Sequence, residues 1–555
     1  MANPQRIYES SYGPNWVPTN VSVAQFLAKY NPDEVPGNKI IISDFDDAAR
    51  TITFEGVRTK PGLGATGLAN ILGLKEGDVV CMIGLNSVNW ILLAHSIMWA
   101  GAVFAGINAV ATSHELVHYF EISEPKAIAV DASLYGKVQD ALKMSTKLQE
   151  KPKVLIIEDG TSTRSYGHPV FPRDIMAFSS GRPPFDLTFR DNRNVPAAMC
   201  FSSGTSGKPK GVLLSHHNLI AYATTLRITS PSLSNWQQIE IFFPPFPHIY
   251  GIAIALMGPA YTGQHVIAMK KFEFTSYLKK CAEVRATIAR LVPATAIQLL
   301  KDPAARKMDL TSIHSVFVAG ASLPDEVAQG LAKQLNGVVV LNGYGMSEGT
   351  ISSLKECRSA EKPGSVGKPQ AGHQVRIVDD DYNDVMPGEQ GECLVKGPTI
   401  FMGYINNEEA TREAFRDGWL CTGDMLKVDS DGFFWLTGRK KELIKYKGNQ
   451  VPPAELESVL LSHEDVNEAG VCGIWDERLE TEVPVGYVNF TRDVPEKDRG
   501  QLLQDIKNYV EERVSPHKKL RGGLFHLESL PKNATGKLMR RDLPAARKQQ
   551  KPSKL

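Results

Sequence analysis

A regular alternation of short apolar runs with amphipathic helical stretches extends from about residue 51 to residue 340. The apolar runs include GDVVCMIGL, KAIAVDA, KVLIIED and GVVVLNGYG. Strand-length apolar runs separated by helical segments are typical of βαβ units, in which helices cover both faces of a largely parallel sheet. The alternation therefore predicts an α/β protein.

The pattern changes in the last third of the chain. Between residues 367 and 424, runs such as VRIVDDD and GECLVKGP lie between glycine-spaced turns, as in small antiparallel sheets. The charged connector GRKKELIKYKGNQ then leads into a segment with its own helix and strand patterns, and 555 residues are too many for one core. We expect a large N-terminal domain at 1–437 with covered, largely parallel sheets and a small antiparallel β subdomain, a hinge at 438–441, a small mobile α+β domain at 442–541, and a basic tail at 542–555.

The composition argues against several classes of protein. A formal net charge of +1 provides no basic stripe for nucleic acid. The seven cysteines contain no C-x-x-C pair, which argues against a zinc site or a disulfide framework and for a reducing compartment. The run WILLAHSIMWAGAVFAGINAVA has the length of a membrane span, but polar residues interrupt it, so we expect a buried helix followed by a buried strand. The first residues lack the basic start and apolar run of a secretory signal.

A loop rich in glycine, hydroxyl and lysine side chains follows the apolar run PAAMCF, which we expect to be a strand. The loop reads SSGTSGKPKGV and differs from the mononucleotide P-loop, because Pro209 stands where that pattern requires glycine. Gly204 and Gly207 allow turns that direct main-chain N–H groups at an anion, while the hydroxyls and lysines add donors and charge. This composition indicates a phosphate site, although a surface loop can have the same composition.

Four further clusters follow in order. NGYGMSE presents the aromatic face of Tyr344, the hydroxyl of Ser347 and, in Glu348, a hard carboxylate suited to magnesium. GWLCTGDM contains Asp424, which can accept hydrogen bonds from a ribose diol. The last two clusters are basic and surround Arg439 in the connector and Lys537 in PKNATGKLMRRDL. Each cluster alone is compatible with a turn or a solvated basic face, but the ordered set indicates one nucleotide site.

The set SSGTSGKPKG, GYGMSE, TGD, GRKKELIKYKGNQVPPAELE and PKNATGKLMRRDL resembles the motifs of the adenylate-forming superfamily. Its members include acyl- and aryl-CoA ligases, firefly luciferase and peptide-synthetase adenylation domains, and this chain looks most like 4-coumarate–CoA ligases and their relatives. The resemblance implies an acid–thiol ligase with Mg²⁺ as cofactor and ATP and CoA as co-substrates. In such enzymes a carboxylate attacks the α-phosphate of ATP to give acyl-AMP and pyrophosphate, and after a domain rotation the thiol of CoA displaces AMP.

The resemblance also implies roles for individual residues. The ATP and AMP site comprises Ser202, Ser203, Gly204, Thr205, Ser206, Gly207, Lys210, Gly320, Asn342, Gly343, Tyr344, Gly345, Ser347, Asp424, Arg439 and Lys537. The acyl substrate lies against His248, Tyr250, Gly320, Gly345, Met346 and Ile351. The resemblance implies that Lys537, His248, Glu348 and Thr205 are catalytic, and that Glu348 and Thr205 are the Mg²⁺ ligands. Lys271, Lys447 and Gly448 match CoA contacts, and Lys441 matches the hinge.

The acid itself is less constrained by the sequence. Relatives that bind a phenolic hydroxyl have a lysine in the segment before Gly320, and SVFVA has none. The apolar side chains of Ile249, Val318 and Ile351 lead us to expect an aryl or medium-chain apolar acid.

Four alternatives share part of this pattern. A luciferase-like oxygenase shares all of these motifs, and an enzyme that loads a separate carrier protein would form the same adenylate. A non-catalytic ATP-binding protein is disfavoured, because Lys537 and Glu348 are both present. An amino-acid-activating domain is also disfavoured, because no aspartate near FPHIYG can pair with a substrate ammonium.

The chain ends in Ser553-Lys554-Leu555, a tripeptide read as a peroxisomal address. The basic segment before it would leave the signal accessible. We therefore expect a peroxisomal enzyme, recognised by the import receptor for this signal and otherwise cytoplasmic. Its other partners are a small carboxylic acid, ATP and CoA, without nucleic acid and without a membrane span.

Overall fold

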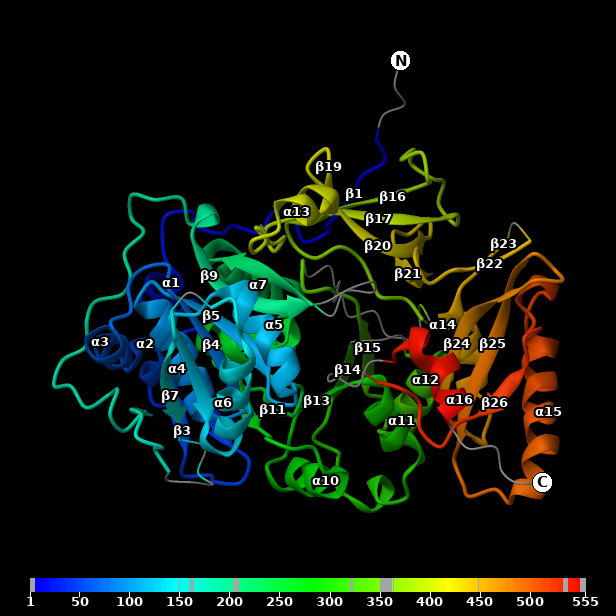
Figure 1. Ribbon diagram of the computed structural model, residues 1–555, viewed down its shortest axis with the longest axis horizontal. Helices are drawn as coiled ribbons and strands as arrows, with labels where there is room; N and C mark the ends of the chain where they lie inside the picture. Colours follow the sequence, from blue (N-terminus) through cyan, green and yellow to red (C-terminus); the bar gives the residue numbers. More distant parts are fainter. Residues whose placement is uncertain are drawn as a thin grey trace.

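The computed structural model describes residues 5–148, 150–158, 160, 164–202, 209–319, 323–349, 362, 364–447, 449–532 and 538–549. Two large, mostly parallel sheets and one antiparallel sheet form the large N-terminal part, and a small α+β part follows at the C-terminus. Figure 1 shows the small part, in orange and red, beside the large part, with the antiparallel sheet in yellow above both. The predicted fold class is confirmed.

The first large sheet has eight strands in the order β18-β10-β9-β5-β4-β6-β7-β8. Their bounds are β4 Val79–Gly84, β5 Val103–Asn108, β6 Ala127–Asp131, β7 Lys153–Ile157, β8 Val170–Phe171, β9 Pro196–Ser202, β10 Lys210–Ser215 and β18 Gly403–Tyr404. The strands from β9 to β8 are parallel to their neighbours, whereas β10 is antiparallel to both β9 and β18. The apolar run PAAMCF therefore forms a strand, as predicted, and the glycine-rich loop joins it to an antiparallel neighbour.

The second large sheet has seven strands in the order β15-β14-β13-β11-β12-β2-β3. Their bounds are β2 Ile40–Asp44, β3 Thr51–Thr53, β11 Ile239–Phe242, β12 His265–Ala268, β13 Ile288–Leu291, β14 Ser315–Ala319 and β15 Val339–Gly343. Within this sheet β3 is antiparallel to β2, and the other pairs are parallel.

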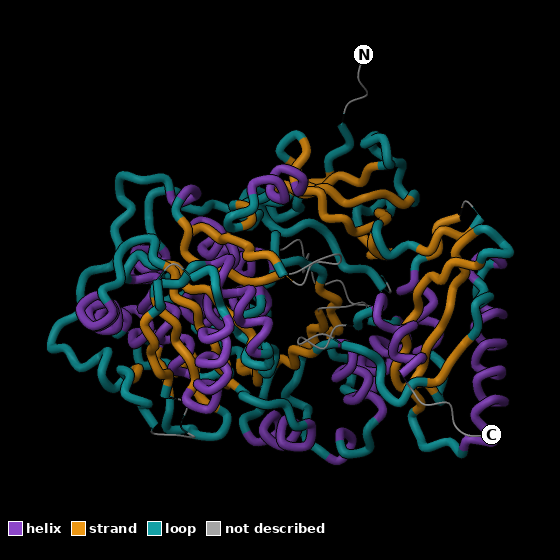
Figure 2. The backbone as a smooth tube through the Cα atoms, viewed as in Figure 1, coloured by secondary structure: helices purple, strands orange, loops and turns teal. Residues whose placement is uncertain are grey.

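Helices form layers on both sides of the two large sheets. Helices α4 (Val88–Trp99) and α7 (His216–Thr229) pack in the core between the sheets, and nearly every side chain of α4 is buried. Helices α5 (Ser113–Ser123) and α6 (Tyr135–Met144) cover the outer face of the first sheet, and α10 (Phe274–Glu283), α11 (Pro293–Lys301) and α12 (Asp325–Gln334) cover that of the second. The layers are visible in Figure 2.

Burial explains the apolar run that has the length of a membrane span. It forms α4, whose Ser87 Oγ accepts a hydrogen bond from the Trp90 backbone N–H at 3.2 Å, followed by β5. A helix between two sheets must be apolar all round. The prediction of a buried helix and a buried strand is thus confirmed, and no helix within the described ranges is both long and apolar enough to cross a membrane.

Six further helical segments surround the two sheets. Near the N-terminus these are α1 (Val23–Lys29), α2 (Phe54–Thr59) and α3 (Pro61–Leu72), and after β11 they are α8 (Ile249–Gly251), the π-helix η3 (Ile252–Met257) and α9 (Gly258–Thr262). Short 3₁₀ turns are η1 (Ala132–Leu134), η2 (Asn192–Asn194) and η4 (Ala305–Lys307). The run from α8 to α9 begins directly after His248 and forms one wall of the site described below.

The antiparallel sheet is formed by β1 (Tyr8–Glu9), β16 (Gln374–Val378), β17 (Gln390–Lys396), β19 (Phe415–Arg416), β20 (Trp419–Val428) and β21 (Phe434–Arg439), with α13 (Glu408–Ala414) beside it. The small part follows β21. It contains the hairpin β22 (Ile444–Tyr446) and β23 (Asn449–Val451), and the sheet β24 (Val466–Asp476), β25 (Thr481–Phe490) and β26 (Leu524–His526). Its helices are α14 (Pro453–Leu461), α15 (Glu496–Arg513) and α16 (Leu543–Gln549), with the 3₁₀ turns η5 (Pro516–Lys518) and η6 (Arg540–Asp542).

Candidate active site

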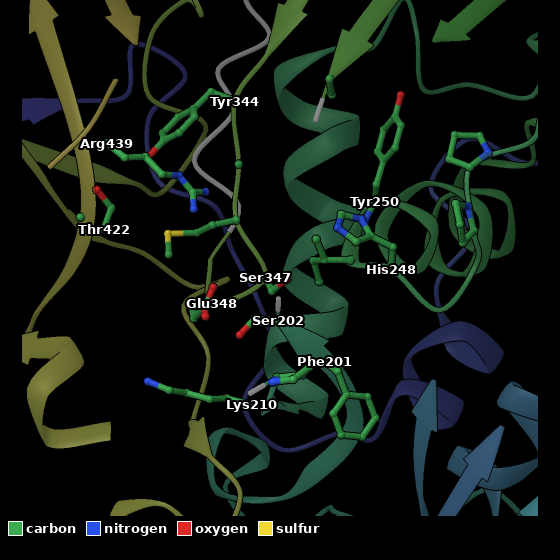
Figure 3. A pocket seen from close by; sticks show the side chains of 18 of the residues that line it. Phe201, Ser202, Lys210, His248, Tyr250, Tyr344, Ser347, Glu348, Thr422 and Arg439 are labelled. Carbon is green, nitrogen blue, oxygen red and sulfur yellow. The ribbon is translucent and has the colours of Figure 1, made fainter. Parts of the chain in front are cut away.

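A cleft of about 1410 Å³ lies where the two large sheets, the antiparallel sheet and the small part meet. Thirteen of the residues singled out from the sequence line it: Ser202, Lys210, His248, Ile249, Tyr250, Gly343, Tyr344, Gly345, Met346, Ser347, Glu348, Arg439 and Lys441. They come from the ends of β9, β15 and β21 and from the segments after β11 and β15. Figure 3 shows Tyr344 and Arg439 on one side of the view and His248 and Tyr250 on the other, with Ser347 and Glu348 between them.

The hairpin of β9 and β10 brings the two ends of the glycine-rich loop to this cleft. Ser202 and Lys210 are paired residues at the open end of the hairpin, and both line the cleft. Residues 203–208, which join them, lie outside the described residues, and so do the predicted roles of Ser203, Gly204, Thr205, Ser206 and Gly207. The ends of the loop are therefore placed at the cleft by two strands of the first sheet.

Glu348 is held by a tyrosine that the sequence reading missed. Its Oε1 accepts a hydrogen bond from Tyr404 Oη at 2.8 Å, and Glu348 is only 7% exposed. Burial and the neighbouring Glu348 charge raise the pKa of Tyr404, so the phenol keeps its proton and acts as the donor. Lys210 Nζ lies 4.7 Å from the centroid of the same ring. Tyr404 thus connects the residue predicted to bind metal with a lysine predicted to bind phosphate.

Tyr344, Asp424 and Arg439 form a second bonded group. Tyr344 Oη donates to Asp424 Oδ2 at 2.6 Å, and Arg439 Nε lies 3.1 Å from Asp424 Oδ1. Asp424 and Arg439 face each other across β20 and β21, which sets their spacing. Burial, followed by the Asp424 charge, raises the pKa of Tyr344 well above its usual value. A carboxylate has about four acceptor positions, so Asp424 keeps capacity for a further donor.

A tight turn orients His248. In PPFPHIYG, a Cβ added at Gly251 would lie 2.5 Å from Phe246 Cα, so the turn closes only with glycine there. This turn makes His248 the N-cap of α8, where its Nδ1 accepts a hydrogen bond from the Tyr250 backbone N–H at 3.2 Å. A neutral imidazole that accepts at Nδ1 carries its proton on Nε2. His248 is thereby fixed in orientation at the cleft wall.

The apolar wall near His248 differs in one residue from the prediction. Val318 is buried in the core beneath α10–α12, on the opposite face of β14 from Phe317, and Phe317 lines the cleft instead. Successive side chains of a strand point to opposite faces, and both faces of this strand are apolar. Gly343 makes room for the Phe317 ring, because a Cβ there would lie 2.3 Å from Phe317 Cζ. Ile249 lines the cleft as expected, and Ile351 lies outside the described residues.

Several predicted residues are not part of the cleft lining. Asn342 pairs with Val318 in the sheet and so shares the face that turns away from the cleft. Lys271 is exposed after the end of β12, and Lys447 lies in the turn between β22 and β23. Asp424 is 4% exposed and reaches the cleft through its partners Tyr344 and Arg439. Gly320, Gly448 and Lys537 lie outside the described residues.

Ion pairs hold the junction between the large and small parts. Lys440 Nζ lies 3.0 Å from Glu392 Oε2 and 2.9 Å from Asp380 Oδ1, both in the antiparallel sheet region. On the other side of Lys441, Arg540 forms ion pairs with Glu442 and, at 2.6 Å, with Glu457. These residues were also missed from the sequence, where they read as ordinary surface charges.

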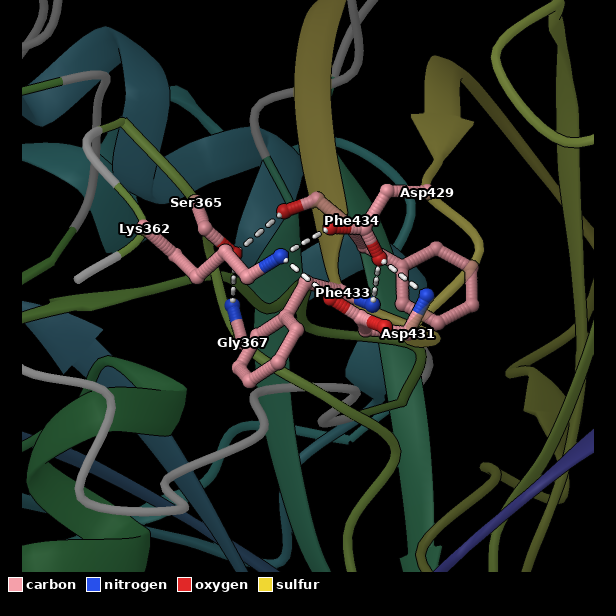
Figure 4. A network of polar contacts seen from close by, with 7 residues as sticks. All are labelled: Lys362, Ser365, Gly367, Asp429, Asp431, Phe433 and Phe434. Atoms are coloured by element: carbon pink, nitrogen blue, oxygen red, sulfur yellow. Dashed lines mark hydrogen bonds and ion pairs between the residues drawn. The ribbon is translucent and has the colours of Figure 1, made fainter.

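A polar network fixes the β20–β21 turn, at the opposite end of this hairpin from Asp424 and Arg439. Lys362 Nζ donates to Asp429 and Asp431 at 2.7 Å each, and Ser365 Oγ donates to the Phe434 carbonyl at 2.9 Å (Figure 4). The Gly367 backbone N–H donates to the same Ser365 hydroxyl at 2.9 Å. The network ties the segment before β16 to the turn of the hairpin that carries the Asp424–Arg439 pair.

The chain matches two family models. Residues 29–405 match the AMP-binding enzyme model, and residues 455–537 match the model of the AMP-binding enzyme C-terminal domain. Among curated proteins, the chain is 32% identical over 554 residues to the probable 4-coumarate–CoA ligase 1 of Dictyostelium discoideum, covering 97% of each chain. It is 34% identical over 481 residues to the peroxisomal OPC-8:0-CoA ligase 1 of Arabidopsis thaliana, covering 85% of this chain and 84% of the other.

Solved structures with the same fold include the anthranilate CoA ligase AuaEII in complex with anthranoyl-AMP. The two chains superpose with a TM-score of 0.84 at 24% identity, over 96% of this chain and 98% of the other. A benzoate CoA ligase from Burkholderia xenovorans superposes with a TM-score of 0.80 at 24% identity, over 94% of this chain and 99% of the other. At this identity the superpositions establish the fold.

Proposed function

The chain belongs to the family of AMP-binding enzymes, and on this premise we propose how its cleft performs the reaction of an acid–CoA ligase. The protein is an ATP-dependent acid–thiol ligase that works through an acyl adenylate. The observation that carries the assignment of roles is the convergence of Ser202–Lys210, Glu348 and the Tyr344–Asp424–Arg439 group on one cleft. These are the groups that a nucleotide, its phosphates and an attacking carboxylate require.

The nucleotide lies along the side of the cleft that contains Tyr344. The Tyr344 ring packs against adenine, while Asp424 and Arg439 take the ribose. The phosphates extend toward the β9–β10 hairpin, where Lys210 and the loop hydroxyls meet their charge. Attack at phosphorus needs alignment and cations more than proton transfer, so oriented N–H donors and lysines are the effective catalytic groups. We assign to His248 and Lys537 the task of contacting the reacting carboxylate, as the family motifs imply.

The residues present fit a magnesium ion held mainly by the nucleotide. Glu348 is a hard ligand, and with Oε1 bonded to Tyr404 it retains acceptor positions for a cation. Within the described part of the chain no group of three or more His, Cys, Asp or Glu forms an all-protein metal site. Magnesium in phosphoryl-transfer sites usually keeps waters and binds one or two carboxylates plus phosphates. Glu348 and Thr205 would hold the ion, which would neutralise charge on the phosphates.

The ion pairs at the junction support Lys441 as the hinge. Lys440 is anchored to Glu392 and Asp380 of the large part, while Glu442 is anchored to Arg540 of the small part. Lys441 is the single residue between the two anchors and is where backbone rotation would meet least resistance. Lys532 and Leu538, which bracket residues 533–537, line the cleft. This placement supports an adenylate-forming arrangement in which Lys537 reaches the site, with Lys271, Lys447 and Gly448 as CoA contacts after rotation.

The test separates the two half-reactions. Lys537→Ala should slow pyrophosphate release by roughly a hundredfold or more, the usual effect of losing one preorganised charge partner. The same variant should convert synthetic acyl-AMP and CoA to thioester at a near-normal rate. Lys447→Glu should leave pyrophosphate release near normal and should block thioester formation from acyl-AMP and CoA. Lys518→Ala, which removes a lysine of the small part paired with Glu455 at 2.7 Å, is the matched control. Equal loss of both half-reactions in folded Lys537→Ala would refute the alternating arrangement.

We further propose a peroxisomal location, because Ser553-Lys554-Leu555 is a peroxisomal address and one relative is named as peroxisomal. This tripeptide lies outside the described residues. A fluorescent protein fused in front of the full chain should gather in peroxisomes, and deletion of the tripeptide should release it to the cytosol. Diffuse fluorescence of the intact fusion would contradict the proposal.

A further inference from the structure

One face of helix α5 lines the cleft beside the β9–β10 hairpin. The residues of this face follow one another at the spacing of a single helical stripe, and they are Glu115, His118, Tyr119 and Ile122. Leu116 and Phe120, both fully buried, fix the other side of the helix in the core of the first sheet. A side chain on a packed helix is placed more precisely than one on a loop. The helix is therefore a rigid support for the groups that its cleft face contacts.

A capping box fixes the start of this helix. Thr112 Oγ1 accepts a hydrogen bond from the Glu115 backbone N–H at 3.3 Å, and Glu115 Oε2 accepts one from the Thr112 backbone N–H at 2.8 Å. Such a reciprocal pair satisfies two donors of the first turn and sets where the helix begins. Because His118 lies one turn after Glu115, the same cap fixes the position of His118 at the cleft.

His118 bonds directly to one end of the glycine-rich loop. Its Nε2 lies 2.8 Å from the Pro209 carbonyl oxygen. A carbonyl oxygen only accepts, so His118 Nε2 carries a proton and donates it to this bond. Proline has a fixed φ and no N–H, which leaves its carbonyl as the only polar backbone group at this position. The bond therefore fixes the backbone immediately before Lys210, the first residue of β10.

The next residue of α5 supports the other strand of the hairpin. The ring centroids of Tyr119 and Phe201 are 4.6 Å apart, and both side chains line the cleft. Phe201 immediately precedes Ser202, the residue that pairs with Lys210. Figure 3 shows Phe201 and Lys210 together, below Ser202. The helix thus contacts both strands of the hairpin at the point where they enter the cleft.

A third contact joins α5 to the segment that carries Tyr404. Asn406, two residues after Tyr404, donates from its Nδ2 to the Ile122 carbonyl at 3.1 Å. That carbonyl lies in the last turn of α5, where carbonyl groups have no partner within the helix. Lys210 Nζ lies over the Tyr404 ring. The helix therefore holds both the backbone in front of Lys210 and the ring beneath its ammonium group.

We propose that His118 is a positioning residue for adenylation, which holds Lys210 in line with the polyphosphate of ATP by fixing the Pro209 carbonyl. The inference deepens the acid–CoA ligase function proposed above and rests on it. In adenylation a carboxylate oxygen bonds to the α-phosphorus while the bond to pyrophosphate breaks, so cations beside the departing phosphates assist this step and its reversal. Once pyrophosphate has left, the adenylate keeps only its α-phosphate, and Lys210 with its support has no further task. The His118 bond should therefore serve adenylation and not thioester formation.

Three replacements of His118 separate the hydrogen bond from packing. His118→Leu removes the donor, and His118→Asn places its amide at the position of Nδ1, from which it cannot reach the carbonyl. His118→Gln places an amide N–H near the position of Nε2 and should restore the bond. In pyrophosphate release at saturating acid, KM for ATP should rise about tenfold in the first two variants and less than about threefold in His118→Gln, with a smaller change in kcat.

Binding and the second half-reaction test where the bond acts. In calorimetric titrations with Mg²⁺ present, pyrophosphate should bind His118→Leu more weakly by about the same factor as ATP, whereas AMP, which has no β- or γ-phosphate, should bind as it does to wild-type enzyme. Thioester formation from synthetic acyl-AMP and CoA should stay near normal. His114→Leu is the matched control and should behave like wild-type enzyme, because His114 is an exposed histidine of the same helix outside the cleft lining.

Each outcome has a distinct meaning. If wild-type enzyme activates acids but the folded His118→Leu and His118→Asn variants keep its ATP dependence, or lose pyrophosphate and AMP binding equally, the inference is wrong while the ligase function stands. The inference is also wrong if His118→Gln is as impaired as His118→Leu. If no acid of a wide screen releases pyrophosphate from wild-type enzyme, the proposed function itself fails, and this inference with it. If His118→Leu does not fold, His118→Asn decides, because it keeps a polar side chain at this position.

Discussion

The two ends of the cleft differ in how their polar side chains are satisfied. At the nucleotide end, Tyr344 is bonded to Asp424 at 2.6 Å, Asp424 is paired with Arg439 at 3.1 Å, and Tyr404 is bonded to Glu348 at 2.8 Å. At the acyl end, the Tyr250 hydroxyl is buried beside Arg290, and the apolar side chains of Ile249, Ile254 and Phe317 line the cleft. Groups that are bonded to one another hold their geometry before a ligand arrives. The end that we assign to the nucleotide is thus held by internal polar bonds, whereas the end that we assign to the acid is shaped mainly by apolar packing.

Breaking the nucleotide end should produce the largest effect. Asp424→Asn replaces an acceptor with an amide, so either Tyr344 or Arg439 loses its partner. Because hydrogen bonds to charged groups contribute about 1.5–3 kcal/mol, we expect kcat/KM for ATP to fall by roughly a hundredfold, measured by pyrophosphate release at varied ATP.

The control for this variant lies on the same hairpin. Asp431→Asn alters the exposed carboxylate that accepts from Lys362 at 2.7 Å and should change ATP use little, because exposed ion pairs contribute at most about 1 kcal/mol. Unchanged ATP dependence in folded Asp424→Asn would contradict the view that the nucleotide end is held by its internal bonds.

A smaller effect should follow from loosening Glu348. Tyr404→Phe removes the 2.8 Å bond to Glu348 Oε1, and we expect a loss of about tenfold in kcat/KM with a higher Mg²⁺ requirement, since the carboxylate is no longer oriented. Pyrophosphate release across a Mg²⁺ titration measures both. Tyr135→Phe, which loses a bond to His168 outside the cleft, is the control. A Mg²⁺ dependence identical to that of wild-type enzyme would mean that Tyr404 is merely structural.

The smallest expected effect is on how stability depends on pH, through two buried histidines in different regions. His95 bonds to the Leu256 carbonyl behind the acyl wall at 3.3 Å, and His373 bonds to Thr399 beneath the antiparallel sheet at 2.7 Å. Burial lowers the pKa of each to about 4. The unfolded chain, with a pKa near 6.5, therefore binds more protons between these values, and acidification in that window favours unfolding. Each histidine should lower the free energy of unfolding by about 1 kcal/mol when the pH falls from 6.5 to 5.5.

Urea unfolding at these two pH values checks this prediction. His95→Gln and His373→Gln should each lose less stability on acidification than wild-type enzyme does, and the exposed control His114→Gln should not differ from it. If both variants lose as much stability on acidification as wild-type enzyme does, neither buried histidine determines the acid sensitivity. If only one variant differs from wild-type enzyme, only the region around that histidine unfolds with the main transition.

The prediction for the acyl wall was wrong mainly about which face of strand β14 lines the cleft. SVFVA is apolar at every position, so its pattern cannot tell which residues point to the cleft, and Val318 was placed there instead of Phe317. The same limit explains Asn342, whose strand register places it on the far face. Where a motif continues past the end of a strand, as YGMSE does after β15, all of its residues line the cleft, as expected from the sequence.

The amino-acid sequence by itself determined the α/β class, the strand before the phosphate loop and the order of the motifs along the cleft. Each of these follows from local periodicity or from residues within one short segment. Only the tertiary structure decided that Tyr404 bonds Glu348, that Lys440 and Glu442 are anchored to different parts, and that Glu240 and Arg290 meet behind Tyr250. Partners such as Glu348 and Tyr404 lie 56 positions apart, and Glu240 and Arg290 lie 50 apart. Sheet order and strand register decide which side chains meet at such separations, and the sequence of a single segment determines neither of them.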